Sequence, residues 1–547
     1  MTRKRVVGSA LWAAWGDALG FMTELADTEL VRQRTGSERV TNTTQWRRRV
    51  GGRSGPTVKM PAGCYSDDTQ LRLATARAIG LNGSFDVTAF SKVELPTFLA
   101  YGLGVGRGTR SAAKNLGKSS VSWNSNFYSS GATQYMQSGG NGAAMRVQPH
   151  VWASGDRENF ESWLGQVLRN VVTTHGHPRA IAGAVFHAAT VALAIKEGTP
   201  PDPAQWRKIA EWLPNVAEVI RHDDDLALLW LSQWERVGAA DLGQAMRVAS
   251  DECLETIATV STMCDSPATD WHELVDAVGG FDPSTRGSGI VTSVLAACLA
   301  HRGVADPVQA LVTAANALQS DTDTIATMAG ALLGAAVSDD LPGPLLDQDF
   351  ISDVATWLES RSRGTEVGRF KYPDLLHWTI PRSQVDLVGL ADGALALAGL
   401  GRLHLSGNEY PAGGSGDAVF QWATLEFGQT VLVRRRFDPV ELPVTPQAPS
   451  REANVAPDQS LRLFEDRPRQ NQPRSEPAGL TEVQTSAPVT DGLTLQVAID
   501  LVVGSGFPED LIGRCLLDLA RQRDGLDKAA AFVAAVAAAY RVGPGKT

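Results

Sequence analysis

Two short acidic clusters, far apart in the chain, carry the residues best suited to chemistry. Asp67 and Asp68 are adjacent in YSDDTQL, and Asp321 and Asp323 stand two residues apart in SDTDTIA. Each cluster opens an apolar run with helical spacing, where a carboxylate stabilises the helix start as a cap and through the helix dipole. One cap needs one acceptor, so capping leaves a carboxylate unexplained in each cluster.

A metal site is the second explanation of the clusters. Four carboxylates gathered in a partly buried site would repel one another strongly unless cations neutralised them. Neither cluster contains His or Cys, so the donors are all oxygen atoms. Such a set favours a hard divalent ion, Mg2+, Mn2+ or Ca2+, over zinc. The pair of clusters therefore predicts a metal site, provided that the two helix starts meet in the folded protein.

A run of basic residues, WRRRVGGRSGPTVK, lies shortly before the first acidic cluster. A solvated loop is the usual explanation of such a run. The alternative is that its arginines guide an anionic substrate toward the acidic site.

Composition narrows the class of protein. The 547 residues carry a formal net charge of -10, which argues against nucleic-acid binding by bulk electrostatics. Five scattered cysteines without a CxxC pair predict reduced thiols in a cytoplasmic protein. Asp17 interrupts the apolar residues near the amino terminus, and no stretch reaches about 18 uninterrupted apolar residues, so neither a signal peptide nor a membrane span is predicted.

The elements that must position the clusters are helices. Apolar and small residues recur at spacings of three and four from residue 6 to about 363, and most of these runs end at Gly, Pro or Asp. Gly330 and Gly334, one helical turn apart after the second cluster, would let another helix approach closely. We predict a mainly α protein with a helical domain over 1–370.

Three smaller parts are predicted after that domain. Residues 418–437 alternate apolar and polar residues on both sides of Gly428, which predicts a β-hairpin within a small α/β or β-containing unit over 371–437. Residues 438–491 are rich in Pro, Gln, Ser and Glu and have too little apolar surface to offset the entropy of folding, so a disordered linker is expected. Residues 492–547 regain helical periodicity in three pieces and predict a small helical module.

Several separated motifs appear in the order known from one enzyme family. They are GSALWAAWGDALGFMTEL, YSDDTQL, GNGAAMRVQP, TTHGHPRA, GSGIVTSVLAACL and SDTDTIATMAGALLGA. In this order they resemble the ADP-ribosylglycohydrolase family, which includes the dinitrogenase reductase activating glycohydrolases. The resemblance covers about 6–340. It implies an all-α, orthogonally packed fold that holds two Mg2+ ions, or Mn2+, beneath a cleft for ADP-ribose.

The resemblance also implies roles for particular residues. The implied metal ligands are Ser66, Asp67, Asp68, Asp321, Asp323 and Thr324. The implied substrate contacts are Asn141, Gly142, Met145, Arg146 and His175, with a structural hydrogen bond as the alternative for His175. Glu24 follows GDALG and matches the family's glutamate near the scissile bond, which makes it the candidate general acid or base. Asp67 and Asp68 are the alternatives for that catalytic role.

The expected activity is metal-dependent hydrolysis of the glycosidic bond between ADP-ribose and a modified macromolecule, with a protein as the expected class of substrate. Such bonds break through a transition state with oxocarbenium character, and a bound metal ion can activate water near neutral pH. Two alternatives stay open: a catalytically silent ADP-ribose-binding protein, and a dinuclear hydrolase of small nucleotide-like substrates.

The carboxyl-terminal helical module has a resemblance of its own. Gly506, Phe507 and Pro508 stand where ubiquitin-associated domains carry their GF loop. The resemblance implies an interaction module with a protein partner, tethered by the linker. The alternative is a plain helical cap without a partner.

Overall fold

The structure, a computed structural model, describes two stretches of the chain. It covers 2–443 apart from 265, 267, 338–339, 365–369, 376 and 414–416, and 494–536 apart from 521–527, 530–531 and 534. The chain divides into two compact units, Met1–Ala453 and Asn454–Thr547. The predicted small unit at 371–437 therefore shares one compact unit with the helices.

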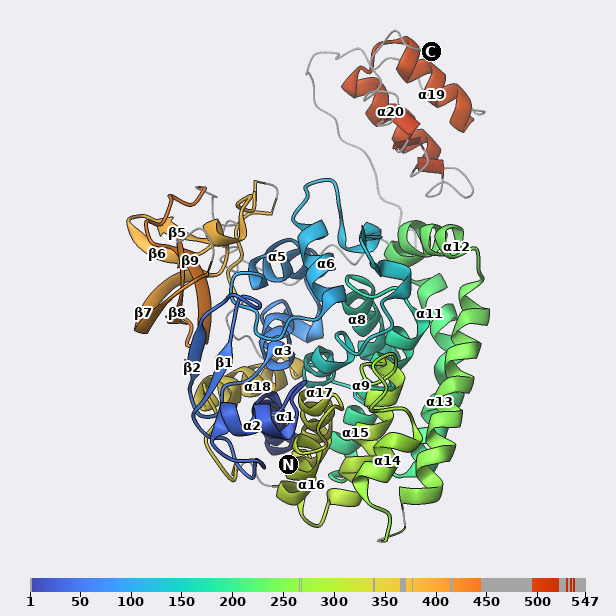
Figure 1. The fold of residues 1–547 in the computed structure, drawn as a ribbon. Coiled ribbons are helices and arrows are strands. Elements are labelled where there is room, and N and C mark those ends of the chain that lie inside the picture. The colour runs from blue at the N-terminus through green and yellow to red at the C-terminus, as the bar shows by residue number, and fades with distance from the viewer. Residues whose placement is uncertain are drawn as a thin grey trace, which may run out of the picture. The chain divides into compact units, whose positions relative to one another are not determined.

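Helices form most of the first unit, as the spacing of apolar residues predicts. Figure 1 shows α9, α15 and α17 in the middle of the helical body, with α13 at one side. The helices of this unit are α1 (Thr2–Phe21), α2 (Thr28–Thr35), α3 (Asp67–Arg77), α4 (Val87–Ala89), α5 (Leu95–Phe98), α6 (Arg107–Leu116), α7 (Gln148–Trp152), α8 (Glu161–Val172), α9 (Pro178–Glu197), α10 (Pro203–Trp212), α11 (Val216–His222), α12 (Ser232–Gly238), α13 (Leu242–Cys264), α14 (Trp271–Ala277), α15 (Gly289–Gly303), α16 (Pro307–Ala315), α17 (Thr322–Leu333) and α18 (Gln348–Ser362).

Small residues let α1 and α17 cross in close contact. A Cβ atom at Gly330 would lie 2.3 Å from the carbonyl oxygen of Trp12, and one at Gly334 would lie 2.2 Å from that of Gly8. At the other end of the crossing, a Cβ atom at Gly20 would lie 2.4 Å from the carbonyl oxygen of Thr322. The predicted close approach at Gly330 and Gly334 is confirmed. The crossing brings the start of α17, which carries the second acidic cluster, against the end of α1.

An antiparallel five-stranded sheet follows the helices, with the strands in sequence order. Its strands are β5 (Val388–Ala391), β6 (Ala394–Leu397), β7 (Gly401–Pro411), β8 (Ala418–Leu425) and β9 (Thr430–Arg436). β8 and β9 pair on either side of Gly428, which adopts φ +105°, so the predicted hairpin is confirmed. Two small hairpins lie within the helical body, β1 (Trp46–Arg49) with β2 (Thr57–Met60) and β3 (Ser129–Ser130) with β4 (Thr133–Gln134).

The sheet packs onto the helical body and onto the β1–β2 hairpin. Trp422 donates its indole N–H to the carbonyl oxygen of Lys59 at 3.1 Å. The backbone N–H of Arg434 donates to the carbonyl oxygen of Ala100 at 3.0 Å. Buried residues of β5 to β9, such as Val388 and Leu432, belong to the same hydrophobic core as the helices. The sheet is therefore part of the unit that positions the acidic clusters.

The second unit contains α19 (Leu495–Gly504) and α20 (Glu509–Ala520), which share a small apolar core around Val502 and Phe532. The third helix predicted for this module falls largely on residues outside the described ones. The linker predicted over 438–491 also lies outside them from residue 444 onward.

One helix among the described residues is long and apolar enough to cross a membrane. It is α9, and 83% of its apolar window is buried inside the protein. It packs against α15 and α8 as a core helix of the helical body.

Candidate active site

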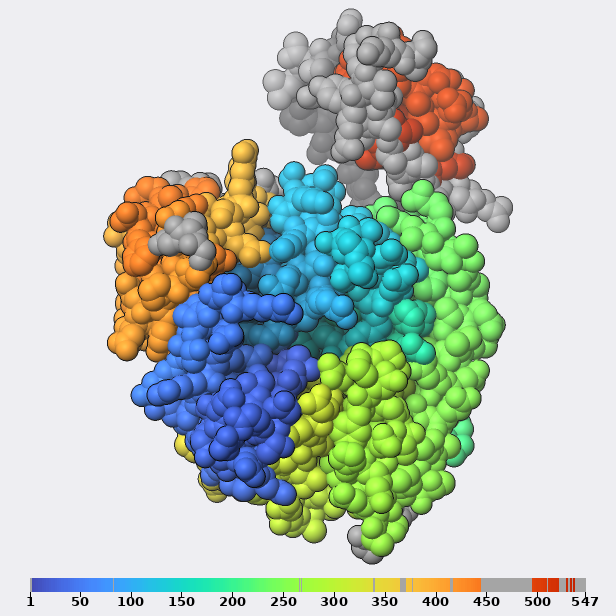
Figure 2. All heavy atoms as spheres, viewed as in Figure 1, coloured from blue at the N-terminus to red at the C-terminus, as the bar shows by residue number. Residues whose placement is uncertain are grey.

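The two acidic clusters lie on the wall of one pocket. α3 starts at Asp67, with Ser66 as its N-cap residue, and Asp68 follows in the first turn. α17 starts directly after Asp321 and carries Asp323 in its first turn. The four aspartates line a cavity of about 470 Å3. Figure 2 shows a hollow on this face, between the blue and cyan segments and the yellow-green ones.

Asp17, a residue that the sequence reasoning did not place in the site, holds the start of α3. Its side chain is fully buried in α1. It accepts hydrogen bonds from the backbone N–H groups of Ser66 and Thr69, each at 2.9 Å, and from the Thr69 hydroxyl at 2.5 Å. An aspartate from another helix thus accepts hydrogen bonds from two of the N–H groups at the start of α3, while the N–H of Asp68 donates to the Ser66 hydroxyl oxygen. Asp67 and Asp68 are thereby released from capping and face the pocket.

Burial and mutual repulsion act on the clustered carboxylates. Burial is the main cause that raises the pKa values of Asp67, Asp68 and Asp323 well above their ordinary value. Nearby carboxylates add to the effect, since Asp321 raises the pKa of Asp68 and Glu24 raises the pKa of Asp323. The two clusters are therefore close enough to interact. Keeping them all ionised at neutral pH requires positive charge nearby.

The oxygen donors of the clusters could hold a divalent cation. Asp68 Oδ1 is buried and has no hydrogen-bond partner among the described residues, while its Oδ2 accepts from the Ser66 hydroxyl at 3.2 Å. A buried oxygen atom in this position suits a hard ion. Across the described stretches, no three His, Cys, Asp or Glu side chains already form a ligand group. The fit to Mg2+ or Mn2+ rests on donor chemistry and not on a preformed ligand geometry.

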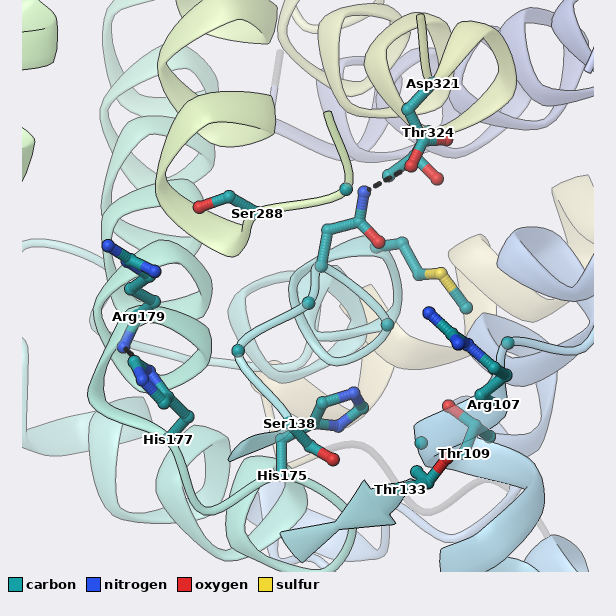
Figure 3. Close-up of a pocket in the computed structure, with 18 of the residues that line it drawn as sticks. Arg107, Thr109, Thr133, Ser138, His175, His177, Arg179, Ser288, Asp321 and Thr324 are labelled. Carbon is teal, nitrogen blue, oxygen red and sulfur yellow. Dashed lines mark hydrogen bonds between the residues drawn. The ribbon is translucent and has the colours of Figure 1, made fainter. Parts of the chain in front are cut away.

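The loop around Asn141 contacts the second acidic cluster through a side-chain hydrogen bond. Asn141 donates its side-chain amide to Asp321 Oδ2 at 2.9 Å and to the Thr292 hydroxyl at 3.0 Å. The first of these bonds is the dashed line that ends at Asp321 in Figure 3. The amide orients Asp321, and the carbonyl end of Asn141 remains as an acceptor for a ligand hydroxyl.

Two arginines hold Glu24 at the pocket rim. Arg48, on β1, forms an ion pair with Glu24 Oε2 at 2.6 Å, and its guanidinium stacks on the Phe21 ring at 4.3 Å. Arg34 donates to the backbone carbonyl of Glu24 at 2.8 Å. One arginine of the basic run is therefore a contact of the candidate catalytic residue, which neither alternative from the sequence predicts.

A glycine is required where the loop before α6 passes the first cluster. Gly104 adopts φ +88°, a left-handed conformation that glycine reaches without strain. A Cβ atom here would lie 2.8 Å from Asp67 Oδ1 and 3.7 Å from Glu24 Oε2. The loop therefore passes close to both Asp67 and Glu24, which line the same part of the pocket.

The predicted substrate contacts divide into residues that line the pocket and one that lies beneath it. Gly142, Met145 and His175 line the pocket. Arg146 is fully buried outside it, where it donates to the Gly142 carbonyl at 2.6 Å and to the Thr174 hydroxyl at 2.7 Å. Arg146 therefore supports the loop at Gly142. It also supports the Thr174 hydroxyl, which forms a hydrogen bond with His175 Nδ1 at 2.7 Å. Burial, with the Arg146 charge as a smaller cause, lowers the pKa of His175 to about 3, so the ring is neutral at pH 7.

Other lining residues were not predicted from the sequence. Figure 3 shows them around the cavity, with Asp321 and Thr324 at one end and His175 toward the other. They include Arg107, Thr109, Thr133, Ser138, Arg179 and Ser288. The glycine-rich run GVGRGTR at the start of α6 is a signal that could have indicated the first two. Ser66, one of the predicted metal ligands, is fully buried and reaches the cluster through its bond to Asp68.

A family model and two curated relatives match this chain. The family model described as ADP-ribosylglycohydrolase matches residues 1–366. The chain is 27% identical over 385 residues to "Uncharacterized protein YegU" of Escherichia coli (strain K12). The aligned region covers 68% of this chain and 98% of that protein. This chain is also 28% identical over 175 residues to ADP-ribosyl-[dinitrogen reductase] glycohydrolase of Rhodospirillum rubrum. That aligned region covers 32% of this chain and 52% of the relative.

A solved structure titled "ADP-ribosylglycohydrolase-related protein complex" aligns with a TM-score of 0.41 at 19% identity, covering 66% of this chain and 99% of that chain. The family match itself extends over well more than half of the sequence and includes both acidic clusters and Glu24. This chain therefore belongs to the ADP-ribosylglycohydrolase family, whose enzymes hydrolyse linkages to ADP-ribose.

Proposed function

We propose that this protein is a cytoplasmic, Mg2+-dependent hydrolase that releases ADP-ribose from a modified macromolecule, with a protein as the expected substrate. The observation that carries the proposal is the convergence of two acidic helix starts and Glu24 on one cavity of about 470 Å3. A cavity of that size matches the usual range for small-molecule sites. The family match supports the ADP-ribose part of the proposal.

The metal would be held by oxygen donors of the two clusters. The proposed ligands are Ser66, Asp67, Asp68, Asp321, Asp323 and Thr324, for two Mg2+ ions or Mn2+. When bound, such ions supply Lewis-acid stabilisation of ribose oxygens and lower the pKa of water. The buried Asp68 Oδ1, which has no hydrogen-bond partner among the described residues, supports this assignment.

The remaining groups would orient the substrate and move a proton. Glu24 stands at the rim next to Asp67 and is the proposed general acid or base at the anomeric centre. His175 is neutral at pH 7 and can form a hydrogen bond to ligand without adding charge. Arg107, exposed at the start of α6, supplies positive charge suited to a pyrophosphate. Bond cleavage then relies on stabilising positive charge that develops on the ribose ring.

The test is a release assay with arginine-linked, serine-linked and nucleic-acid-linked ADP-ribose, with Mg2+ and with a chelator. We expect release of free ADP-ribose from at least one substrate, abolished by the chelator and by Asp323→Ala. Unchanged turnover by Asp323→Ala would refute the assignment of the site.

Two other outcomes would support the alternative functions. ADP-ribose binding by calorimetry without turnover of any substrate would indicate a silent reader. Turnover restricted to free nucleotides and small adducts would indicate a hydrolase of small nucleotide-like substrates. Both outcomes would contradict the macromolecular substrate proposed here.

A further inference from the structure

A second pocket lies at the seam between the helical body and the five-stranded sheet. Its volume is about 440 Å3. Lys114, near the end of α6, forms one wall, and Arg434 and Arg436 of β9 form another. Ser383, Gln384 and the carboxylate of Asp417 add polar groups to the lining, and Val385 and Ala418 complete it. Three basic side chains face one acidic side chain in this lining, so hydrogen-bond donors predominate.

The positive charges of this pocket are only partly neutralised. Arg436 is paired with Asp386 at 2.5 Å, and Asp417 acts on it as a second nearby negative charge. Arg434 differs, because its buried Nε has no hydrogen-bond partner among the described residues, and its guanidinium lies near the Phe420 ring at 5.9 Å. Lys114 is exposed and forms no ion pair within the described part of the chain.

The orphaned Nε of Arg434 shows that this side chain is not fully satisfied by the protein, and Arg434 lines the pocket. Arg434 offers N–H donors in a fixed planar arrangement, which matches the oxygen atoms of phosphate, and Lys114 adds a mobile point charge. The lining contains few apolar side chains, so a compact oxyanion suits it better than a nucleobase. We propose that this pocket binds a phosphate group, either free inorganic phosphate or a phosphomonoester, through Arg434 and Lys114.

The site is separate from the ADP-ribose pocket but is joined to it by one helix. Arg107 and Thr109 line the larger pocket at the start of α6, and Lys114 lies five residues beyond Thr109, about 7.5 Å along the helix axis. Arg434 and the other sheet residues of the pocket lie beyond residue 366, where the family match ends. Phosphate binding here does not depend on the proposed hydrolase function.

The test is isothermal titration of the full-length protein, without divalent metals, using inorganic phosphate in one arm and free phosphoserine in the other. We expect saturable binding in at least one arm, weakened about tenfold or more by Arg434→Gln and by Lys114→Gln, since each removes a charge-assisted contact. Stronger binding of phosphoserine would identify the ligand as a phosphomonoester, and stronger binding of inorganic phosphate would identify the free ion.

Two further variants serve as controls. Arg402→Gln removes an exposed arginine of β7 that does not line the pocket, and it should leave the affinity unchanged. Arg434→Lys keeps the charge and should bind more tightly than Arg434→Gln. Because Lys114 is exposed, its variant should fold even if the Arg434 variants do not, and circular dichroism checks each protein. Absence of binding by the wild type, or equal affinity in Lys114→Gln and wild type, would overturn the proposal.

Discussion

Replacing Asp17 by Asn should destabilise the protein, although the change alters little in size. Both carboxylate oxygens of Asp17 accept hydrogen bonds: Oδ1 from the Ser66 N–H, and Oδ2 from the N–H and hydroxyl of Thr69. In Asp17→Asn one of these oxygens becomes an NH2 group, so at least one buried backbone N–H at the start of α3 faces a donor. A buried donor left without an acceptor costs about 1–3 kcal/mol, a large part of a total stability of about 5–15 kcal/mol.

Asp323→Asn should change stability in the opposite direction when metal is absent. Asp323 is a buried carboxylate whose pKa is raised by burial and by neighbouring carboxylates, so its ionised form is unfavourable in the folded state. A neutral Asn relieves that repulsion, and its side-chain oxygen can still accept from the Thr324 N–H. The same change should remove the stabilisation by Mg2+, which for the wild type is about 2.7 kcal/mol at a hundred times the dissociation constant.

The assay is urea unfolding of wild type, Asp17→Asn and Asp323→Asn, each with a chelator and with Mg2+. We expect Asp17→Asn to lose similar free energy of unfolding in both buffers, and Asp323→Asn to equal or exceed the wild type in chelator but gain nothing from Mg2+. Wild-type stability of Asp17→Asn, or destabilisation of Asp323→Asn in chelator, would show that the capping and ligand roles are assigned wrongly.

Three further predictions follow from the site and the core. Arg48→Gln removes the ion pair that holds Glu24 and should lower kcat about tenfold with little change in KM in the ADP-ribose release assay; an equal rise in KM would contradict a positioning role. Gly104→Ala should lower activity and the unfolding midpoint, because a Cβ atom would strain a positive φ and contact Asp67; wild-type behaviour in both assays would exclude this crowding. Burial lowers the pKa of His187 to about 3, so the unfolded state binds a proton that the folded state does not between about pH 6.5 and pH 3. Stability is therefore fully present above pH 6.5 and falls as the pH is lowered through this window, by up to about 1.4 kcal/mol per pH unit. His187→Gln should reduce that slope in urea titrations at several pH values, whereas the same change at exposed His404 should not.

Local patterns in the sequence were sufficient to predict the helical body, the helix starts at the acidic clusters and one hairpin. Helix starts at the two acidic clusters follow from carboxylates and hydroxyls that precede apolar runs, and the β8–β9 hairpin follows from alternation around Gly428. The spacing of Gly330 and Gly334 indicated a close helix crossing, since small residues at one-turn intervals form a narrow stripe on a helix. These signals depend on residues within a few positions of one another, so they can be read from a single sequence.

Only the tertiary structure decided which groups act on one another. Asp17 caps α3 from another helix, 49 residues before Ser66, and Arg48 reaches Glu24 from a hairpin that the carboxyl-terminal sheet supports. Arg146 is buried beneath the pocket it was expected to line, because its guanidinium supports the loop carbonyl of Gly142. Such contacts join residues that are far apart in the sequence and depend on how the helices cross and the chain reverses. Local periodicity therefore cannot predict them.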